Sequence, residues 1–85
     1  MSSAKSLIAE AVSQFPLQTT TEWCSRHPGC DIERIEADAA SISTVDCLFD
    51  GECRIVVKGD PGAIPAHVFG RFDGRRAEID RIVFQ

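Results

Sequence analysis

The sequence predicts an α+β domain in which an N-terminal helix and a short second helix pack on a twisted, four- to five-stranded antiparallel sheet. Three observations lead to this prediction. Apolar residues recur with the helical period over the first fifteen residues, and from residue 31 the apolar period changes to two, as in strands. Two Phe-Asp-Gly steps, at residues 49–51 and 72–74, then favour turns between antiparallel strands. We therefore expect sequential hairpins.

Length and composition indicate one globular unit. The 85 residues make a single domain, 1–85, with room for one small core. Apolar residues are 44% of the chain and charged residues 26%, which is typical of folded proteins. The net charge of −4 argues against a nucleic-acid partner, because binding to phosphates needs clustered Lys and Arg.

The chain shows no sign of a membrane or secretory segment. No stretch approaches the roughly 18 apolar residues of a membrane span, and the start lacks the basic and apolar regions of a signal peptide. We therefore expect a cytoplasmic protein without a membrane partner. In that compartment, the four cysteines are expected to be thiols rather than a disulfide framework.

An apolar stripe predicts the first helix. Pro16 ends this helix at Phe15, and Ser2 or Ser3 can cap its start. The apolar residues share the spacing i, i+3, i+4, i+7, i+8 and i+11: Ala4, Leu7, Ile8, Ala11, Val12 and Phe15.

A capping box predicts the second helix. Thr19 is followed three residues later by Glu22, which favours a helix from about Thr20 to Arg26. Trp23 is expected to lie in the core.

Period-two alternation predicts the strands. A turn is expected at residues 38–40, and Gly, Asp and Pro at residues 59–62 favour another. The first strand has an alternative, because Ile32, Ile35 and Ala37 also fit a short helix. The expected strands are 31–37, 41–49, 53–58, 66–72 and 75–84.

The length of the loop at the first Phe-Asp-Gly step decides which residues share a face of the hairpin, and this predicts the strand register. A three-residue loop, Phe49–Gly51, sets Cys47 opposite Cys53 on an apolar face and Asp46 opposite Arg54 on the other. A two-residue Asp-Gly loop would mix the two faces, so the longer loop is favoured.

The second step favours a two-residue loop at residues 73–74. This register sets His67 opposite Asp80, on the face that also carries Ile82 and Phe84. The end of the last strand is then apolar on both sides. Such an end indicates a dimer interface or a helix lying over it.

The His67–Asp80 pair is the candidate catalytic site. A carboxylate beside a histidine orients the ring and favours its charged form, as a general base requires. No nucleophile lies near this pair in a recognisable motif, and a surface charge pair is the alternative interpretation. We expect no cofactor.

The cysteines occur as two CxxxxxC pairs. Cys24, His27 and Cys30, with a cysteine from the hairpin, are the candidate zinc ligands. Their spacing is unlike that of structural zinc sites, so we favour an interpretation without metal. For Cys47 and Cys53, the alternative to two thiols is a cross-strand disulfide.

The C-terminal segment VFGRFDGRRAEIDRIVFQ resembles the closing hairpin of NTF2-like (SnoaL-type) proteins. The order of helix and then sheet is also similar to the broader cystatin-like arrangement. This resemblance implies a strand, a glycine turn and a last strand that line a pocket.

Two functions are therefore expected. The first is a small non-catalytic protein that acts by protein–protein contact, as a homodimer. The alternative is a small-ligand-binding or enzymatic cystatin/NTF2-like domain with its site near His67 and Asp80.

Overall fold

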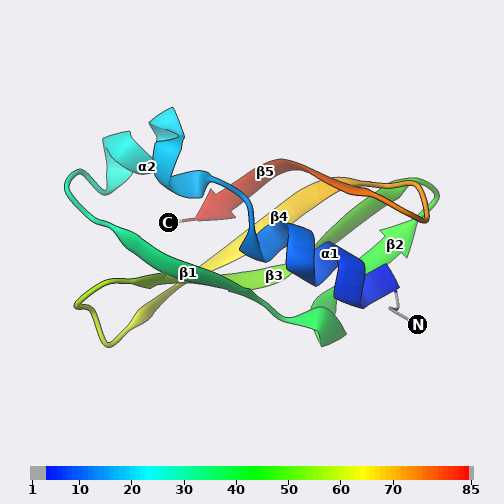
Figure 1. Ribbon diagram of the computed structural model, residues 1–85, viewed down its shortest axis with the longest axis horizontal. Coiled ribbons are helices and arrows are strands. Elements are labelled where there is room, and N and C mark those ends of the chain that lie inside the picture. Colours follow the sequence, from blue (N-terminus) through cyan, green and yellow to red (C-terminus); the bar gives the residue numbers. More distant parts are fainter. Residues whose placement is uncertain (1–3, 85) are drawn as a thin grey trace.

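The computed structural model describes residues 4–84 and has an α+β fold, so the predicted fold class is confirmed (Figure 1). Two helices and two 3₁₀ turns accompany the sheet: α1 (Ala4–Ser13), η1 (Leu17–Thr19), α2 (Thr21–Arg26) and η2 (Ala39–Ser41). The antiparallel sheet contains β1 (Ile32–Ala37), β2 (Ser43–Val45), β3 (Leu48–Val57), β4 (Ala63–Phe72) and β5 (Ala77–Phe84).

Helix α1 lies across one face of the sheet, where it contacts β1 and β5 (Figure 1). Its apolar stripe is confirmed by Ile8 and Val12, which are fully buried. The helix ends at Ser13, two residues before the predicted end at Phe15. The predicted caps, Ser2 and Ser3, lie outside the described residues.

Helix α2 covers one end of β5. Its cap is Thr20 rather than the predicted Thr19: the Thr20 side-chain oxygen accepts a hydrogen bond from the Trp23 backbone N–H at 3.3 Å. Trp23 is buried, as predicted, and its ring lies 5.4 Å from that of Phe84. Arg26 Nη1 also donates to the Phe84 carbonyl oxygen at 2.7 Å. These contacts hold the last strand under the helix.

Strand β3 is the central element of the sheet. It pairs with β4 on one side and with both β1 and β2 on the other. Strands β1 and β2 do not pair with each other, so the predicted turn at residues 38–40 does not join a hairpin. They form instead one edge of the sheet, interrupted at residues 38–42, where the 3₁₀ turn η2 leaves the strand direction.

The prediction for the first Phe-Asp-Gly step is wrong. The turn lies at residues 46–47, where Asp46 has the left-handed φ of 57°, and residues 49–51 continue within β3. The physical reason is burial: every second residue of β3 from Phe49 to Val57 faces the core, and a loop at residues 49–51 would interrupt that face.

The first hairpin's predicted contacts change with this register. Cys53 is buried, whereas Cys47 lies exposed in the turn, and both are thiols. Arg54 forms its ion pair with Glu36, at 3.5 Å, rather than with Asp46.

The second hairpin has a four-residue loop, 73–76, in place of the predicted two residues. The Asp73 carboxylate accepts the backbone N–H groups of Arg75 at 2.9 Å and Arg76 at 2.8 Å. These hydrogen bonds lower the pKa of Asp73 and stabilise the longer loop.

A β-bulge at Asp80 sets the faces of β5. Ile79 pairs with Gly70 and Arg81 pairs with Phe69, so Asp80 is the extra residue. The bulge turns Ile82 and Phe84 into the core, where both are nearly inaccessible. The predicted placement of these two residues beside His67 is therefore wrong, and Val83 occupies that face instead.

The core lies between the helices and one face of the sheet. Its members are apolar side chains from every layer of the fold: Ile8, Val12, Leu17, Trp23, Ile35, Ile42, Phe49, Cys53, Ile55, Val57, Val68, Ile82 and Phe84.

Gly70 permits a close approach between neighbouring strands. It pairs with Phe49, whose ring covers it. A Cβ atom at this position would lie 2.6 Å from two ring atoms of Phe49 and would also meet the Glu78 carbonyl oxygen. A side chain at residue 70 is therefore sterically excluded.

We predict that Gly70→Ala destabilises the fold by about 1–3 kcal/mol or more, because the core must shift to admit the methyl group. Gly62→Ala is the matched control: its nearest neighbour would be Asp60 Oδ1 at 3.5 Å, so the change is expected to stay within about 0.5 kcal/mol. Urea unfolding followed by circular dichroism measures both. Equal stability of the two variants would contradict the packing argument.

Candidate functional site

The sheet has a second face that no helix of residues 4–84 covers, and we call it the open face. Its side chains alternate with the buried ones along each strand. Strand pairing places side chains from all five strands on this face: Arg34, Glu36, Ser43, Val45, Leu48, Asp50, Glu52, Arg54, Val56, Ala63, Pro65, His67, Phe69, Arg71, Glu78, Arg81 and Val83.

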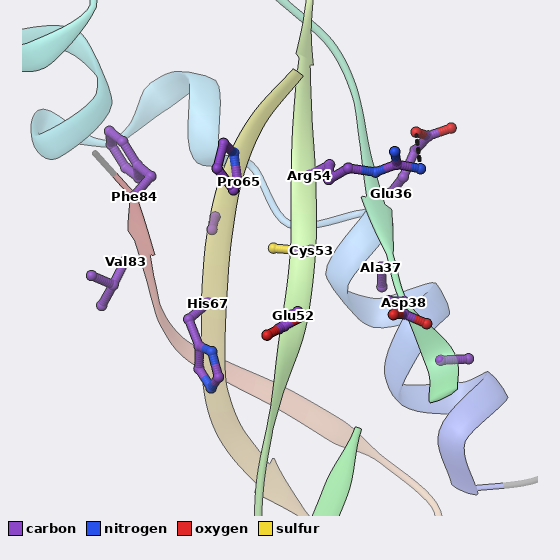
Figure 2. Close-up of a pocket in the computed structure, with 12 residues that line it drawn as sticks. Glu36, Ala37, Asp38, Glu52, Cys53, Arg54, Pro65, His67, Val83 and Phe84 are labelled. Atoms are coloured by element: carbon purple, nitrogen blue, oxygen red, sulfur yellow. Dashed lines mark ion pairs between the residues drawn. The ribbon is translucent and has the colours of Figure 1, made fainter. Parts of the chain in front are cut away.

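His67 lies near the middle of the open face. Strand pairing places it between Glu52 on β3 and Val83 on β5 (Figure 2). Its Nε2 atom is 3.4 Å from Asp50 Oδ2, and its ring lies 4.8 Å from that of Phe69. Both members of the His67–Asp50 pair are about half exposed, so the pair contributes at most about 1 kcal/mol to stability.

The structure does not bring the predicted partner, Asp80, to His67. The bulge shifts the register so that Val83 lies opposite His67. The carboxylate of Asp80 instead forms an ion pair with Arg71 Nε at 3.6 Å. The observed partner of His67 is Asp50, which lies on β3. Identifying it from the sequence would have required the correct pairing of β3 with β4.

A shallow concavity of about 820 Å³ lies beside His67 (Figure 2). Charged side chains of both signs line it together with apolar ones: Glu36, Asp38, Glu52, Arg54, Pro65, His67 and Val83. Such a surface can bind a small polar molecule, but no oriented nucleophile accompanies the histidine among the residues that line it.

Cys53 is the cysteine that borders this concavity, and it is not poised as a nucleophile. Cys53 is 3% exposed, and this burial raises the pKa of its thiol to about 11. The reactive species is the thiolate, which is scarce at neutral pH when the pKa is so high.

Two of the predicted zinc ligands, Cys24 and His27, use their side chains in other contacts, and Cys30 is held through its backbone carbonyl group. Cys24 Sγ donates to the Gln18 carbonyl oxygen at 3.4 Å, and the His27 ring stacks on Trp23 at 4.5 Å. The Cys30 carbonyl oxygen accepts from Gln18 Nε2 and Trp23 Nε1, each at 3.1 Å. Within residues 4–84, no group of three or more His, Cys, Asp or Glu side chains is placed to hold a metal ion.

Sequence reasoning missed an apolar stripe that runs diagonally across the open face. Val45 and Leu48 lie opposite each other, Phe69 is diagonal to Leu48 on β4, and Val83 is diagonal to Phe69 on β5. Val45 is 69% exposed, Leu48 59% and Val83 48%. The signal in the sequence is the spacing of 77, 79, 82 and 84, which predicts a bulge and turns Val83 outward.

Comparison with known proteins finds no protein-family model, no curated protein and no solved structure that matches this chain. The resemblance of the C-terminal hairpin to NTF2-like proteins therefore stays a prediction. In the described part of the chain, no helix has the length and apolar character needed to cross a membrane.

We predict that Cys24 and Cys47 react rapidly with iodoacetamide in the folded protein, because both are exposed, and that Cys53 reacts only on unfolding. Peptide mass spectrometry after timed labelling measures each rate. Rapid native labelling of Cys53 would contradict the predicted burial.

Burial of Cys53 also predicts a pH dependence of stability. Its pKa is about 11 in the folded protein against 9.0 for an exposed thiol, so the folded state keeps this proton where the unfolded chain loses it. The stabilising contribution is fully present below about pH 9 and is lost as the pH rises through about 11. Urea unfolding is expected to show that the free energy of unfolding declines less with pH in Cys53→Ala than in the wild type. Equal declines in the two proteins would contradict a raised pKa of the buried thiol.

Proposed function

We propose that this protein acts without catalysis, by protein–protein contact through the open face, and that it does so as a homodimer. The observation that carries the proposal is the apolar stripe of Val45, Leu48, Phe69 and Val83 on an uncovered sheet face. Full burial of a fully exposed aliphatic side chain contributes about 1.5–3 kcal/mol, and the three aliphatic members of the stripe are 48–69% exposed, so covering each would contribute roughly half to two-thirds of that. This gain offsets part of the cost of association.

The dimensions of the molecule support an interface on this face. The principal extents are 37 × 23 × 17 Å, so the sheet lies across the two longer dimensions. A stable interface buries about 800 Å² on each partner. A face of this size can supply that area.

Both edges of the sheet are unsuited to pairing with another strand, which favours contact through the face. The β1–β2 edge is interrupted at residues 38–42, and β5 carries the bulge at Asp80. Interruptions and bulges of this kind hinder strand addition.

We predict a concentration-dependent dimer in sedimentation velocity experiments. Leu48→Lys is expected to raise the dissociation constant about tenfold or more, because it places a charge in the buried stripe. Gln14→Lys introduces the same side chain at an exposed position on the helical side of the molecule, so it serves as the control and should leave the dimer unchanged. A wild-type protein that stays monomeric at high micromolar concentration would refute the proposal.

A second candidate function is the binding of a small ligand beside His67, with or without chemistry. The concavity of about 820 Å³ next to the His67–Asp50 pair is the observation that favours it. The candidate site includes Asp50 in place of the predicted Asp80.

A fragment screen by amide NMR tests this second candidate. Binding predicts shifts confined to Glu52, His67, Val83 and their neighbours, and their loss in His67→Ala. Shifts at Cys24 or Cys47 instead, or none from a broad library, would contradict a ligand site beside His67.

A further inference from the structure

We propose that residue 73 is a site of covalent modification: the Asp73–Gly74 step converts spontaneously to an isoaspartyl linkage in the folded protein, whereas the fold protects the Asp50–Gly51 step. The only co-reactant is water. This inference is independent of the proposed homodimer and of the candidate ligand site.

The reaction joins the backbone nitrogen of a glycine to the side chain of the preceding aspartate. The Gly74 nitrogen bonds to Asp73 Cγ, and the carboxyl hydroxyl group leaves as water with the amide proton. Water then opens the resulting succinimide ring at the main-chain carbonyl carbon, so that the chain runs through Cβ and Cγ and the free carboxylate lies on Cα. The water lost in the first step is regained in the second. Glycine favours ring closure because it has no side chain to obstruct the nitrogen and its backbone is permissive.

The chain contains its own matched pair for this reaction. The two Asp-Gly steps belong to the same tripeptide, Phe-Asp-Gly, at residues 49–51 and 72–74. Their immediate covalent surroundings are therefore alike, and similar reaction rates are expected in the unfolded chain. Any large difference between the two steps in the folded protein then reports the effect of the fold.

The first step is held inside the sheet. Asp50 is paired with β2 on one side and with β4 on the other. Gly51 is buried against Ile42, whose Cγ1 would lie 2.8 Å from a Cβ atom at residue 51. Ring closure requires rotation of the backbone between Asp50 and Gly51, which this packing prevents. The reaction must therefore wait for the central strand to open, and openings of core strands are the rarest in a folded protein.

The second step lies outside the sheet. Asp73 and Gly74 begin the loop 73–76, in which every residue is exposed. Gly74 has a φ of 98°, and no atom lies within 4 Å of a Cβ built at this position. Local opening of an exposed loop costs little free energy compared with opening of the core. The backbone at this step can therefore reach the geometry of ring closure while the sheet stays intact.

Hydrogen bonds within the loop slow the reaction at Asp73. Its Oδ1 atom accepts from the backbone N–H groups of Arg75 at 2.9 Å and Arg76 at 2.8 Å. These hydrogen bonds lower the pKa of the Asp73 carboxyl group, and the ionised group lacks the hydroxyl that leaves as water. The expected order of rates is therefore the unfolded chain first, the folded Asp73 step second and the folded Asp50 step last.

The modification is expected to loosen the loop and leave the sheet in place. It adds a methylene group to the backbone and moves the carboxylate that accepts from Arg75 and Arg76. The end of β5 is held independently, because Phe84 is buried and its carbonyl oxygen accepts from Arg26 at 2.7 Å. In the modified protein, the amide protons of Arg75 and Arg76 are thus expected to exchange with solvent faster, while those of the core strands keep their protection.

Peptide mapping of aged wild-type protein tests the proposal. The folded protein is incubated at neutral pH for several weeks, in parallel with a sample unfolded in urea. Trypsin then places the two steps in different peptides, and an isoaspartate-specific methyltransferase with mass spectrometry quantifies the isoaspartate in each. In the folded sample, residue 73 is expected to react about tenfold or more faster than residue 50, because only the latter needs the core to open. In urea the two are expected to react at similar rates.

Asp73→Asn and Asp50→Asn are the matched variants. An amide side chain forms the same succinimide ring and releases ammonia, so deamidation is read directly as a gain in mass. The substituted side chain also keeps the oxygen that accepts the hydrogen bonds of the loop. The first variant is expected to deamidate while folded, and the second only in urea. Thermal unfolding verifies that each variant is folded, and the wild-type comparison needs no substitution.

Selective accumulation of isoaspartate at residue 73 in the folded protein supports the proposal. Equal rates at the two steps, or a faster reaction at residue 50, would overturn it. The absence of isoaspartate at residue 73 over a period in which the urea-unfolded chain reacts would also overturn it, since the loop would then protect Asp73 as fully as the strand protects Asp50.

Discussion

Burial of one face of β3 is the constraint on which the rest of the structure depends. Every second side chain from Phe49 to Val57 points under the helices, and the strand is paired along both of its sides. A one-residue slip would expose that whole set to water, so the register is strongly specified. Because the intervening residues must then point the other way, the same constraint places Asp50 and Glu52 on the open face. The alternation of side chains along β3 therefore contributes to both the core and the candidate interface.

The elements with a clear period could be predicted from the sequence, and the loops could not. The stripe around Ile8 and Val12 reports helical burial directly, and it is confirmed. The two Phe-Asp-Gly steps have the same local turn preference, but the first continues within a strand and the second forms a loop. In the first, burial of Phe49 and Gly51 outweighs that preference, whereas in the second the Asp73 carboxylate satisfies backbone N–H groups and stabilises a loop. Local sequence does not contain this difference, because it depends on packing with distant residues.

The candidate site shows the same limit: the sequence identifies a residue, but it does not identify the partner of that residue. His67 was identified as a surface group of interest, but its carboxylate partner depends on the register of two different hairpins. One extra residue, Asp80, changes every pairing beyond it, and Val83 moves to the open face as a result. The apolar stripe was missed for this reason. Its members are separated along the chain and become neighbours only when four strands are placed side by side.

The bulge at Asp80 has a consequence for the size of any assembly. A sheet that adds strands at a free edge presents a new free edge after each addition, so the process continues toward fibres. Contact through a face behaves differently, because the surface that makes the contact is consumed by it and the group closes at a fixed number of copies. The irregular edges of this sheet hinder strand addition, so the dimer proposed above, if it forms through the open face, would be a closed complex rather than a growing one.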